Sequence, residues 1–166
     1  MSGPRPHPIR DEECAECRRM IANKRFQAAL RGYTDTDGSK CIPYLAGSDE
    51  SGTTVFFDEH LPAKISVRKN GTLKSLDPRP FLRIHETVEG VLIRLYGFDY
   101  AKAHRYATCE ERAAVEAAGI AWRSYETALE PMIRIDEHDK PTNMPKNLLS
   151  AAYKGTKYYT ALQKAA

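Results

Sequence analysis

The stretch from Asp77 to Gly97 constrains the fold of this chain more than any other part of the sequence. Asp77 can cap free backbone N–H groups and Pro78 suits the first helical position, whereas a glycine such as Gly97 commonly ends a helix. Between these ends, apolar residues recur at three- and four-residue spacing: Phe81, Ile84, Val88, Val91, Leu92 and Leu95. The pattern predicts one helix with a single buried face.

Ionisable side chains interrupt this apolar face. His85 lies inside the stripe, Glu89 follows one turn later at its edge, and Glu86 is adjacent to His85. Residues four apart on a helix stand roughly 6 Å apart along the axis and point the same way. Burying such groups costs several kcal/mol unless each finds a partner, so the helix requires polar partners elsewhere in the chain.

A second helix, from Asp99 to Gly119, supplies such partners. Its expected inward face consists of Tyr100, Ala103, His104, Ala107, Glu111, Ala114, Val115 and Ala118. A two-residue link separates the two helices, which favours antiparallel packing of their buried faces. Two neutral imidazoles and a carboxylate suit zinc, with a fourth position open for water. Glu86, beside the first imidazole, could take a proton from that water.

Residues 85–89, HETVE, resemble the H-E-x-x-H signature of the zincin metallopeptidases, with Glu89 in place of the second histidine. The resemblance extends over about residues 41–118. It implies that His85, Glu89 and His104 hold zinc, a permuted form of the His, His, Glu set of the gluzincin branch. It also implies that Glu86 is the general base. A peptide or protein substrate would then lie along an edge strand such as residues 53–57.

Glu111 lies seven residues from His104, roughly 10 Å along a helix, which is too far for both to share one ion comfortably. We expect Glu111 to orient a ligand histidine instead. The residues also leave a second interpretation open. His85 and His104 could be core histidines bonded to Glu89 and Glu111, as a polar network in a non-enzymatic interaction module.

The change of periodicity along the chain predicts an α+β fold: a small antiparallel sheet packed on a helical bundle, in a minimal zincin-like arrangement. Strands are expected at residues 41–45, 53–57, 65–67 and 72–73, and further helices at residues 11–32 and 121–135, the latter bent or broken at Pro131. We expect a flexible tail over residues 1–10 and a single domain over residues 11–166. Its core would span residues 41–135, with a helical C-terminal part over residues 136–166.

Composition narrows the functional classes. A net charge of +3 over 166 residues does not favour nucleic acid as a partner. No apolar run approaches the roughly 20 residues that span a bilayer, and the N-terminus lacks the apolar core of a signal peptide. We therefore expect no membrane association and a cytoplasmic location with all four cysteines reduced. Cys14 and Cys17 are expected to be unpaired, buried packing residues. The oligomeric state is not predicted.

Overall fold

The computed structural model describes residues 9–36, 41–42, 45–136, 144–149 and 151 of the chain. The expected N-terminal tail lies outside these residues except for residues 9 and 10. Of the expected helical C-terminal part, residues 136, 144–149 and 151 are described, and residues 144–149 are not helical, because Leu148 instead forms an isolated antiparallel bridge with Asp49. The described part contains helices together with one three-stranded and one two-stranded sheet, which confirms the α+β class. None of its helices is long and apolar enough to cross a membrane.

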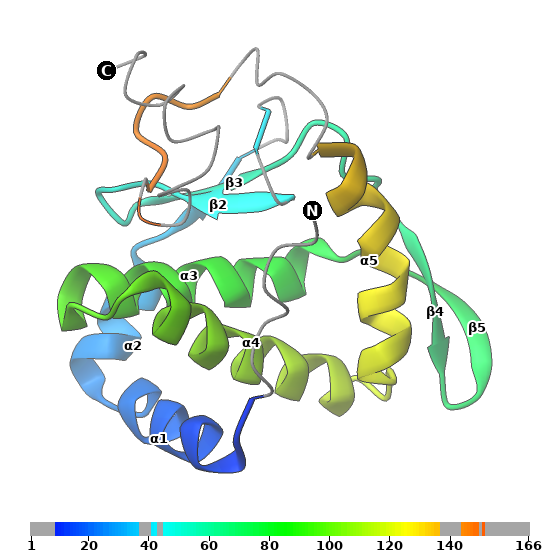
Figure 1. Cartoon of the computed structure of the whole chain (residues 1–166), viewed down its shortest axis with the longest axis horizontal. Helices are drawn as coiled ribbons and strands as arrows, with labels where there is room; N and C mark the ends of the chain where they lie inside the picture. The colour runs from blue at the N-terminus through cyan, green and yellow to red at the C-terminus, as the bar shows by residue number, and fades with distance from the viewer. Residues whose placement is uncertain (1–8, 37–40, 43–44, 137–143, 150, 152–166) are drawn as a thin grey trace.

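Two long helices, α3 (Arg79–Tyr96) and α4 (Tyr100–Ala117), lie side by side at the centre of the molecule (Figure 1). The predicted end of α3 at Gly97 is confirmed, and the helix begins one residue later than expected, after Pro78. The Asp77 carboxylate accepts a hydrogen bond from the Arg79 N–H at 3.0 Å, and Gly97 ends α3 with φ 68°. The Asp99 carboxylate caps α4 by accepting from the Lys102 N–H at 2.8 Å. Local capping chemistry therefore fixes both helices and the short link between them.

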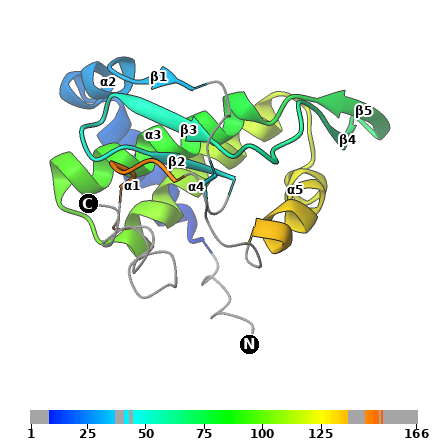
Figure 2. The same ribbon diagram turned by 90° about the horizontal axis from the view of Figure 1, so that it is seen from above.

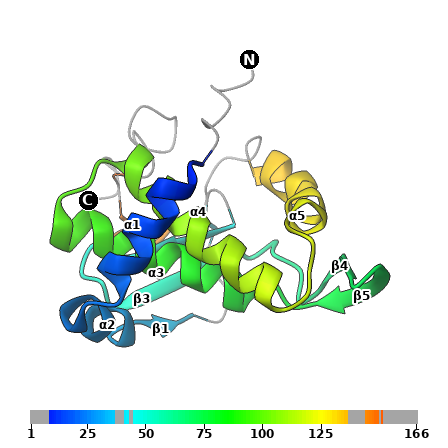
Figure 3. The same cartoon turned by 90° about the horizontal axis from the view of Figure 1, so that it is seen from below.

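The N-terminal region forms two helices where the sequence predicted one. Helix α1 (Asp11–Ile21) ends before Asn23, and α2 (Lys24–Arg31) begins after it. Asn23 has an extended backbone and its side chain accepts a hydrogen bond from the Arg25 N–H, so it caps a new helix instead of continuing the first. Helix α1 packs on α4, on the side away from the three-stranded sheet (Figures 1 and 3).

The three-stranded sheet has the order β1-β3-β2, with β1 (Thr34–Asp35), β2 (Ala46–Ser48) and β3 (Thr54–Phe57). Strand β1 runs parallel to β3 and β2 runs antiparallel to it. The expected strand at residues 41–45 is thus displaced to β2. The sequence also missed β1, so the expectation that residues 53–57 form an edge strand is wrong: β3 is central.

Strand β1 is held beside β3 by the residue that precedes it. Tyr33 is buried, and its hydroxyl accepts a hydrogen bond from the Arg94 guanidinium of α3 at 2.8 Å. This contact fixes the start of β1, and the Thr34 N–H then bonds to the Thr53 carbonyl at 2.8 Å. Nothing in the short polar segment around Thr34 signals a strand, because the pairing depends on a helix 61 positions further along the chain.

The predicted Asn70-Gly71 hairpin is confirmed as β4 (Ile65–Lys69) and β5 (Thr72–Leu76), which are longer than expected. Asn70 and Gly71 both have positive φ, 48° and 79°, as a type I′ turn requires. The hairpin forms its own sheet and projects from one end of the molecule (Figures 1 and 2). Helix α5 (Trp122–Asp136) lies against β4 and continues through Pro131 without the expected break.

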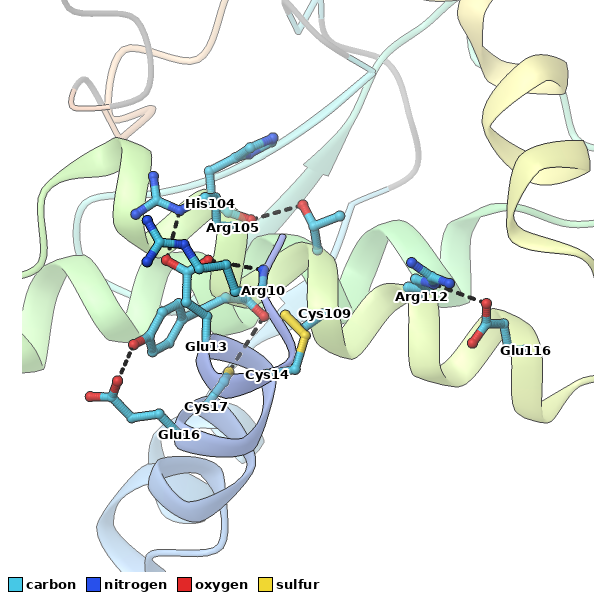
Figure 4. Close-up of a disulfide and its surroundings, with 12 residues drawn as sticks. Arg10, Glu13, Cys14, Glu16, Cys17, His104, Arg105, Cys109, Arg112 and Glu116 are labelled. Atoms are coloured by element: carbon cyan, nitrogen blue, oxygen red, sulfur yellow. Dashed lines mark hydrogen bonds and ion pairs between the residues drawn. A yellow bond between two sulfur atoms is a disulfide. The ribbon is translucent and has the colours of Figure 1, made fainter. Parts of the chain in front are cut away.

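A disulfide joins Cys14 of α1 to Cys109 of α4 (Figure 4). The expectations that Cys14 is unpaired and that all four cysteines are reduced are therefore wrong. Cys17 is free and buried, as predicted, and its thiol donates to the Tyr106 carbonyl at 3.4 Å. The pairing could not be read from spacing because the two partners are 95 positions apart and meet only when α1 packs on α4.

Gly90 allows α3 to approach the sheet closely. A Cβ at this position would lie 2.6 Å from the Tyr33 hydroxyl and 2.8 Å from the Ser48 hydroxyl. Gly90→Ala should therefore lower the free energy of unfolding by about 1–3 kcal/mol, although alanine normally favours a helix over glycine by about 1 kcal/mol. Urea unfolding measures this. The same change in a Tyr33→Phe/Ser48→Ala background should cost less, and an increase in wild-type stability would contradict the close approach.

Candidate metal centre

His85 is held by a chain of hydrogen bonds that crosses three helices. Its Nδ1 lies 2.9 Å from Glu111 Oε2 on α4, and the Tyr125 hydroxyl of α5 donates to Glu111 Oε1 at 2.8 Å. All three residues are buried. A carboxylate offers only lone pairs, so His85 Nδ1 carries the hydrogen of the shared bond. This fixes the ring orientation and directs His85 Nε2 toward the second half of the cluster.

Three potential ligand atoms form a small triangle there. His85 Nε2 lies 3.0 Å from His104 Nδ1 and 3.3 Å from Glu89 Oε2, and the third edge, from His104 Nδ1 to Glu89 Oε2, is 3.0 Å. Ligand atoms around a tetrahedral zinc at about 2.0–2.1 Å stand about 3.3–3.4 Å apart. The triangle therefore has nearly the size of one face of such a coordination shell, and these three residues could hold a metal ion.

Hydrogen bonds alone do not satisfy this triangle. If both nitrogens carry hydrogens, two N–H donors face each other across 3.0 Å. If only His85 Nε2 carries one, the His104 Nδ1 lone pair faces a carboxylate oxygen at 3.0 Å. Each placement of protons leaves one edge without a hydrogen bond, whereas one cation between the three atoms would accept a lone pair from each.

The charges of the cluster are strongly coupled. Burial raises the pKa of Glu89, but hydrogen bonds from His104 and His85 outweigh it and hold the Glu89 pKa at about 2. Burial lowers the pKa of His85, and the hydrogen bonds to Glu111 and Glu89 outweigh it and raise the pKa well above its ordinary value. The cluster therefore holds Glu89 as an anion that faces both imidazoles.

Glu86 lies beside the triangle, half-buried on α3. Burial first, and then the negative charge of Glu89, raise the pKa of Glu86 to about 8. No described residue donates a hydrogen bond to its carboxylate. With this pKa the Glu86 carboxyl group is mostly protonated at neutral pH in the metal-free protein, and its role as general base stays a prediction.

The structure thus brings together His85, Glu89 and His104, the three residues expected to hold a metal. Glu111 does not reach the triangle and bonds to the far side of the His85 ring, the kind of position expected for it. Sequence reasoning missed Tyr125, whose position in α5 carried no polar signal. It also missed the contact of Tyr100, whose hydroxyl lies 3.5 Å from His104 Nδ1 and whose four-residue spacing from His104 could have indicated it.

Comparisons with protein-family models, with curated proteins and with solved structures gave no match to this chain. The function must therefore be argued from the residues of the cluster.

The pKa shifts predict how stability depends on pH in metal-free protein. The raised pKa of His85 contributes stability that is fully present below about pH 6.5 and is lost as pH rises through the folded-state pKa. The raised pKa of Glu86 likewise makes stability fall as pH rises, from about pH 4.5 to about pH 8. The lowered pKa of Glu89 contributes stability above pH 4.5 that is lost as pH falls toward 2. In the presence of a chelator, the contribution of these three groups to stability should therefore be greatest near pH 4.5 and should fall as the pH rises from there.

Thermal unfolding across pH 3–9, on the order of one pH unit per step, tests this in wild type and in Glu89→Gln. The variant should lose part of the stability difference between pH 3 and 5 because its amide does not titrate, whereas Asp49 and Glu13, whose pKa values are also lowered, keep their contributions. A wild-type transition temperature that is the same at pH 6 and pH 9 in chelator would contradict the pKa assignment of His85 and Glu86.

Proposed function

We propose that the protein is a metal-dependent hydrolase whose metal, zinc, is held by His85, Glu89 and His104. The observation that carries this proposal is the triangle of His85 Nε2, Glu89 Oε2 and His104 Nδ1, with edges of 3.0–3.3 Å that protons cannot satisfy together. Two imidazoles and one carboxylate are the protein ligands of many catalytic zinc sites, which keep a further position for water.

The surroundings of the triangle support a metal over protons alone. Metal-binding histidines commonly donate their other ring N–H to a carboxylate, which is the relation of His85 to Glu111. The Tyr125 hydroxyl in turn holds that carboxylate in place. The solvent-facing side of the centre is at His104, whose side chain is 39% exposed against 9% for His85 and 5% for Glu89. An ion and a substrate would enter from this side.

Bound zinc would lower the pKa of its water toward 7. The positive charge of the bound ion would lower the pKa of Glu86 from its metal-free value of about 8, and the Glu86 carboxylate would then accept the proton from that water. The resemblance of residues 85–89 to the zincin signature favours a peptide or protein substrate. A substrate strand would not pair with β3, because both edges of that strand are already occupied.

One observation favours a second candidate, a structural polar network without metal. A doubly protonated His85 would face Glu111 on one side and Glu89 on the other, at 2.9 and 3.3 Å, and so be paired without an ion. The protein would then be an interaction module with the same fold. Metal content separates the two candidates.

The first experiment is elemental analysis of protein purified without a chelator or a histidine tag. The expected result is about one zinc per wild-type chain, as one three-ligand site allows. His104→Ala should lose most of this metal and unfold at a lower temperature, because metal bound to the native state adds to its stability. His60→Ala is the matched control, since His60 is exposed, pairs with Asp58 and is not one of the three residues of the triangle.

Iron in place of zinc would identify another two-histidine, one-carboxylate centre and remove zinc from the proposal. Full metal occupancy in His104→Ala would show the ligand set to be wrong. Wild-type protein without metal, even after incubation with zinc, would leave the structural network as the function of the cluster.

Glu86→Gln separates metal binding from catalysis. The variant should keep its zinc, since Glu86 is not one of the three residues of the triangle. It should hydrolyse a mixed library of fluorogenic peptides about 10²–10⁴-fold more slowly than wild type, because an amide cannot accept the proton of the water. Equal rates in the two proteins would remove Glu86 from the mechanism.

Glu111→Gln tests the orientation of His85. Loss of the charged hydrogen bond at Nδ1 should weaken zinc binding about 10–100-fold in a competition titration with a chromophoric chelator. Glu116→Gln is the matched control on the same helix, because Glu116 is exposed and, within the described part of the chain, pairs with Arg112 alone. Unchanged affinity in Glu111→Gln would mean that the ring is held by packing alone.

A further inference from the structure

The projecting hairpin has one covered edge and one open edge. Along the outer side of β4, the Arg68 N–H donates to the Ser124 hydroxyl at 2.8 Å, the Arg68 carbonyl accepts from the Ala121 N–H at 3.4 Å, and the Asn70 N–H donates to the Gly119 carbonyl at 3.2 Å. Within the described part of the chain, no residue bonds to the outer side of β5. Residues 72–76 therefore form an exposed edge strand, apart from a half-buried Leu76.

The register identifies the outward backbone groups. A two-residue turn joins the strands after Lys69 and before Thr72, so these two residues form a hydrogen-bonded pair and every second pair follows them. Thr72, Lys74 and Leu76 thus bond to β4. Leu73 and Ser75 direct their N–H and carbonyl groups away from it. These two residues therefore offer two N–H donors and two carbonyl acceptors with which a further strand could pair.

A groove lies on one face of the hairpin, between β5 and the α4–α5 link that covers the edge of β4. It has a volume of about 350 Å³ and an apolar floor made by Val67, Leu76, Ala118 and Ile120. Lys69 and Lys74 line it as well, and neither forms an ion pair with a described residue. On the other face, Leu73 is 65% exposed. The groove therefore combines an apolar floor with two unpaired positive charges.

The charge of the hairpin is of one sign. Residues 61–76 contain three lysines and one arginine and no aspartate or glutamate. A ligand strand with acidic side chains would be attracted to the edge, and its alternate apolar side chains would lie next to Leu76, at the β5 side of the groove.

We propose that the open edge of β5 binds an extended acidic polypeptide segment by strand addition. The backbone of the partner pairs with Leu73 and Ser75, its carboxylates meet Lys69 and Lys74, and its apolar side chains pack against Leu76, the groove residue on β5. This surface is separate from the metal centre, and the proposal does not depend on the proposed hydrolase function.

Two other occupants fit less well. A second copy of this chain pairing β5 with β5 would bring the lysines of two basic hairpins together, and like charges directly opposite destabilise strand pairs. Single-stranded nucleic acid is bound through aromatic side chains on which bases stack, and residues 61–76 contain no aromatic residue. The unpaired backbone and the acidic complement required by the lysines favour a polypeptide.

The test uses the full chain, labelled with ¹⁵N, and a blocked seven-residue peptide that alternates glutamate and valine. Binding should slow amide hydrogen exchange at Leu73 and Ser75, whereas Thr72, Lys74 and Leu76 should already be protected in the free protein. A peptide that alternates lysine and valine is the charge control and should not bind. The chelated protein should bind the acidic peptide as well as the metal-loaded protein.

Two variants separate strand addition from attraction by charge. Ser75→Pro removes an outward N–H but no ladder bond of the hairpin and no charge, and should weaken binding about tenfold. Lys69→Glu/Lys74→Glu should weaken it at least as much. Lys24→Glu, an equally exposed charge reversal at the start of α2, should leave binding unchanged.

If Ser75→Pro binds the peptide as tightly as wild type and the lysine variant does not bind it, the surface attracts acidic peptides by charge alone. The proposal of strand addition would then be wrong. No peptide binding at millimolar concentration would also overturn it. So would displacement of the peptide by an oligonucleotide that binds the same residues more tightly, because the occupant would then be a nucleic acid.

Discussion

The contact between His85 and Glu111 is the interaction on which the centre of the molecule depends. It joins α3 to α4 by a charged hydrogen bond in a buried interface, and Tyr125 extends it to α5. Charged groups in such a place destabilise a fold unless they are paired, so neither residue can lose its partner without leaving a costly buried charge. The same bond that fixes how the helices pack therefore fixes the orientation of the imidazole.

The opposite face of α3 is held against the sheet by equally specific contacts. Arg94 bonds to the Tyr33 hydroxyl and to the Ser51 carbonyl, and the absence of a side chain at Gly90 lets the helix lie close to β2. Helix α3 thus has little freedom to rotate about its axis, since rotation would break contacts on both faces. The position of His85 and Glu89 is set by the whole fold and not by their own helix alone.

The sequence predicted what local chemistry decides and missed what distant partners decide. The ends of α3 follow from Asp77 and Gly97, and the hairpin follows from Asn70-Gly71, because each signal acts within a few residues. The Cys14–Cys109 disulfide depends on a partner 95 positions away, and β1 depends on Arg94. The break between α1 and α2 also has a local cause, the capping side chain of Asn23. It was missed because helices often tolerate an asparagine, so the amphipathic pattern of residues 11–32 predicted one continuous helix.

The cluster followed from periodicity because its members lie on the inward faces of two adjacent helices. Residue spacing could not predict which carboxylate contacts which nitrogen of His85. Glu111 contacts Nδ1 and Glu89 contacts Nε2, and this division depends on how far α3 and α4 are shifted along each other. That division is what gives the centre its chemical character. Two carboxylates on one side of the ring would simply neutralise it. One on each side fixes the ring through Nδ1 and leaves Nε2 in a set of three atoms that could hold a single metal ion.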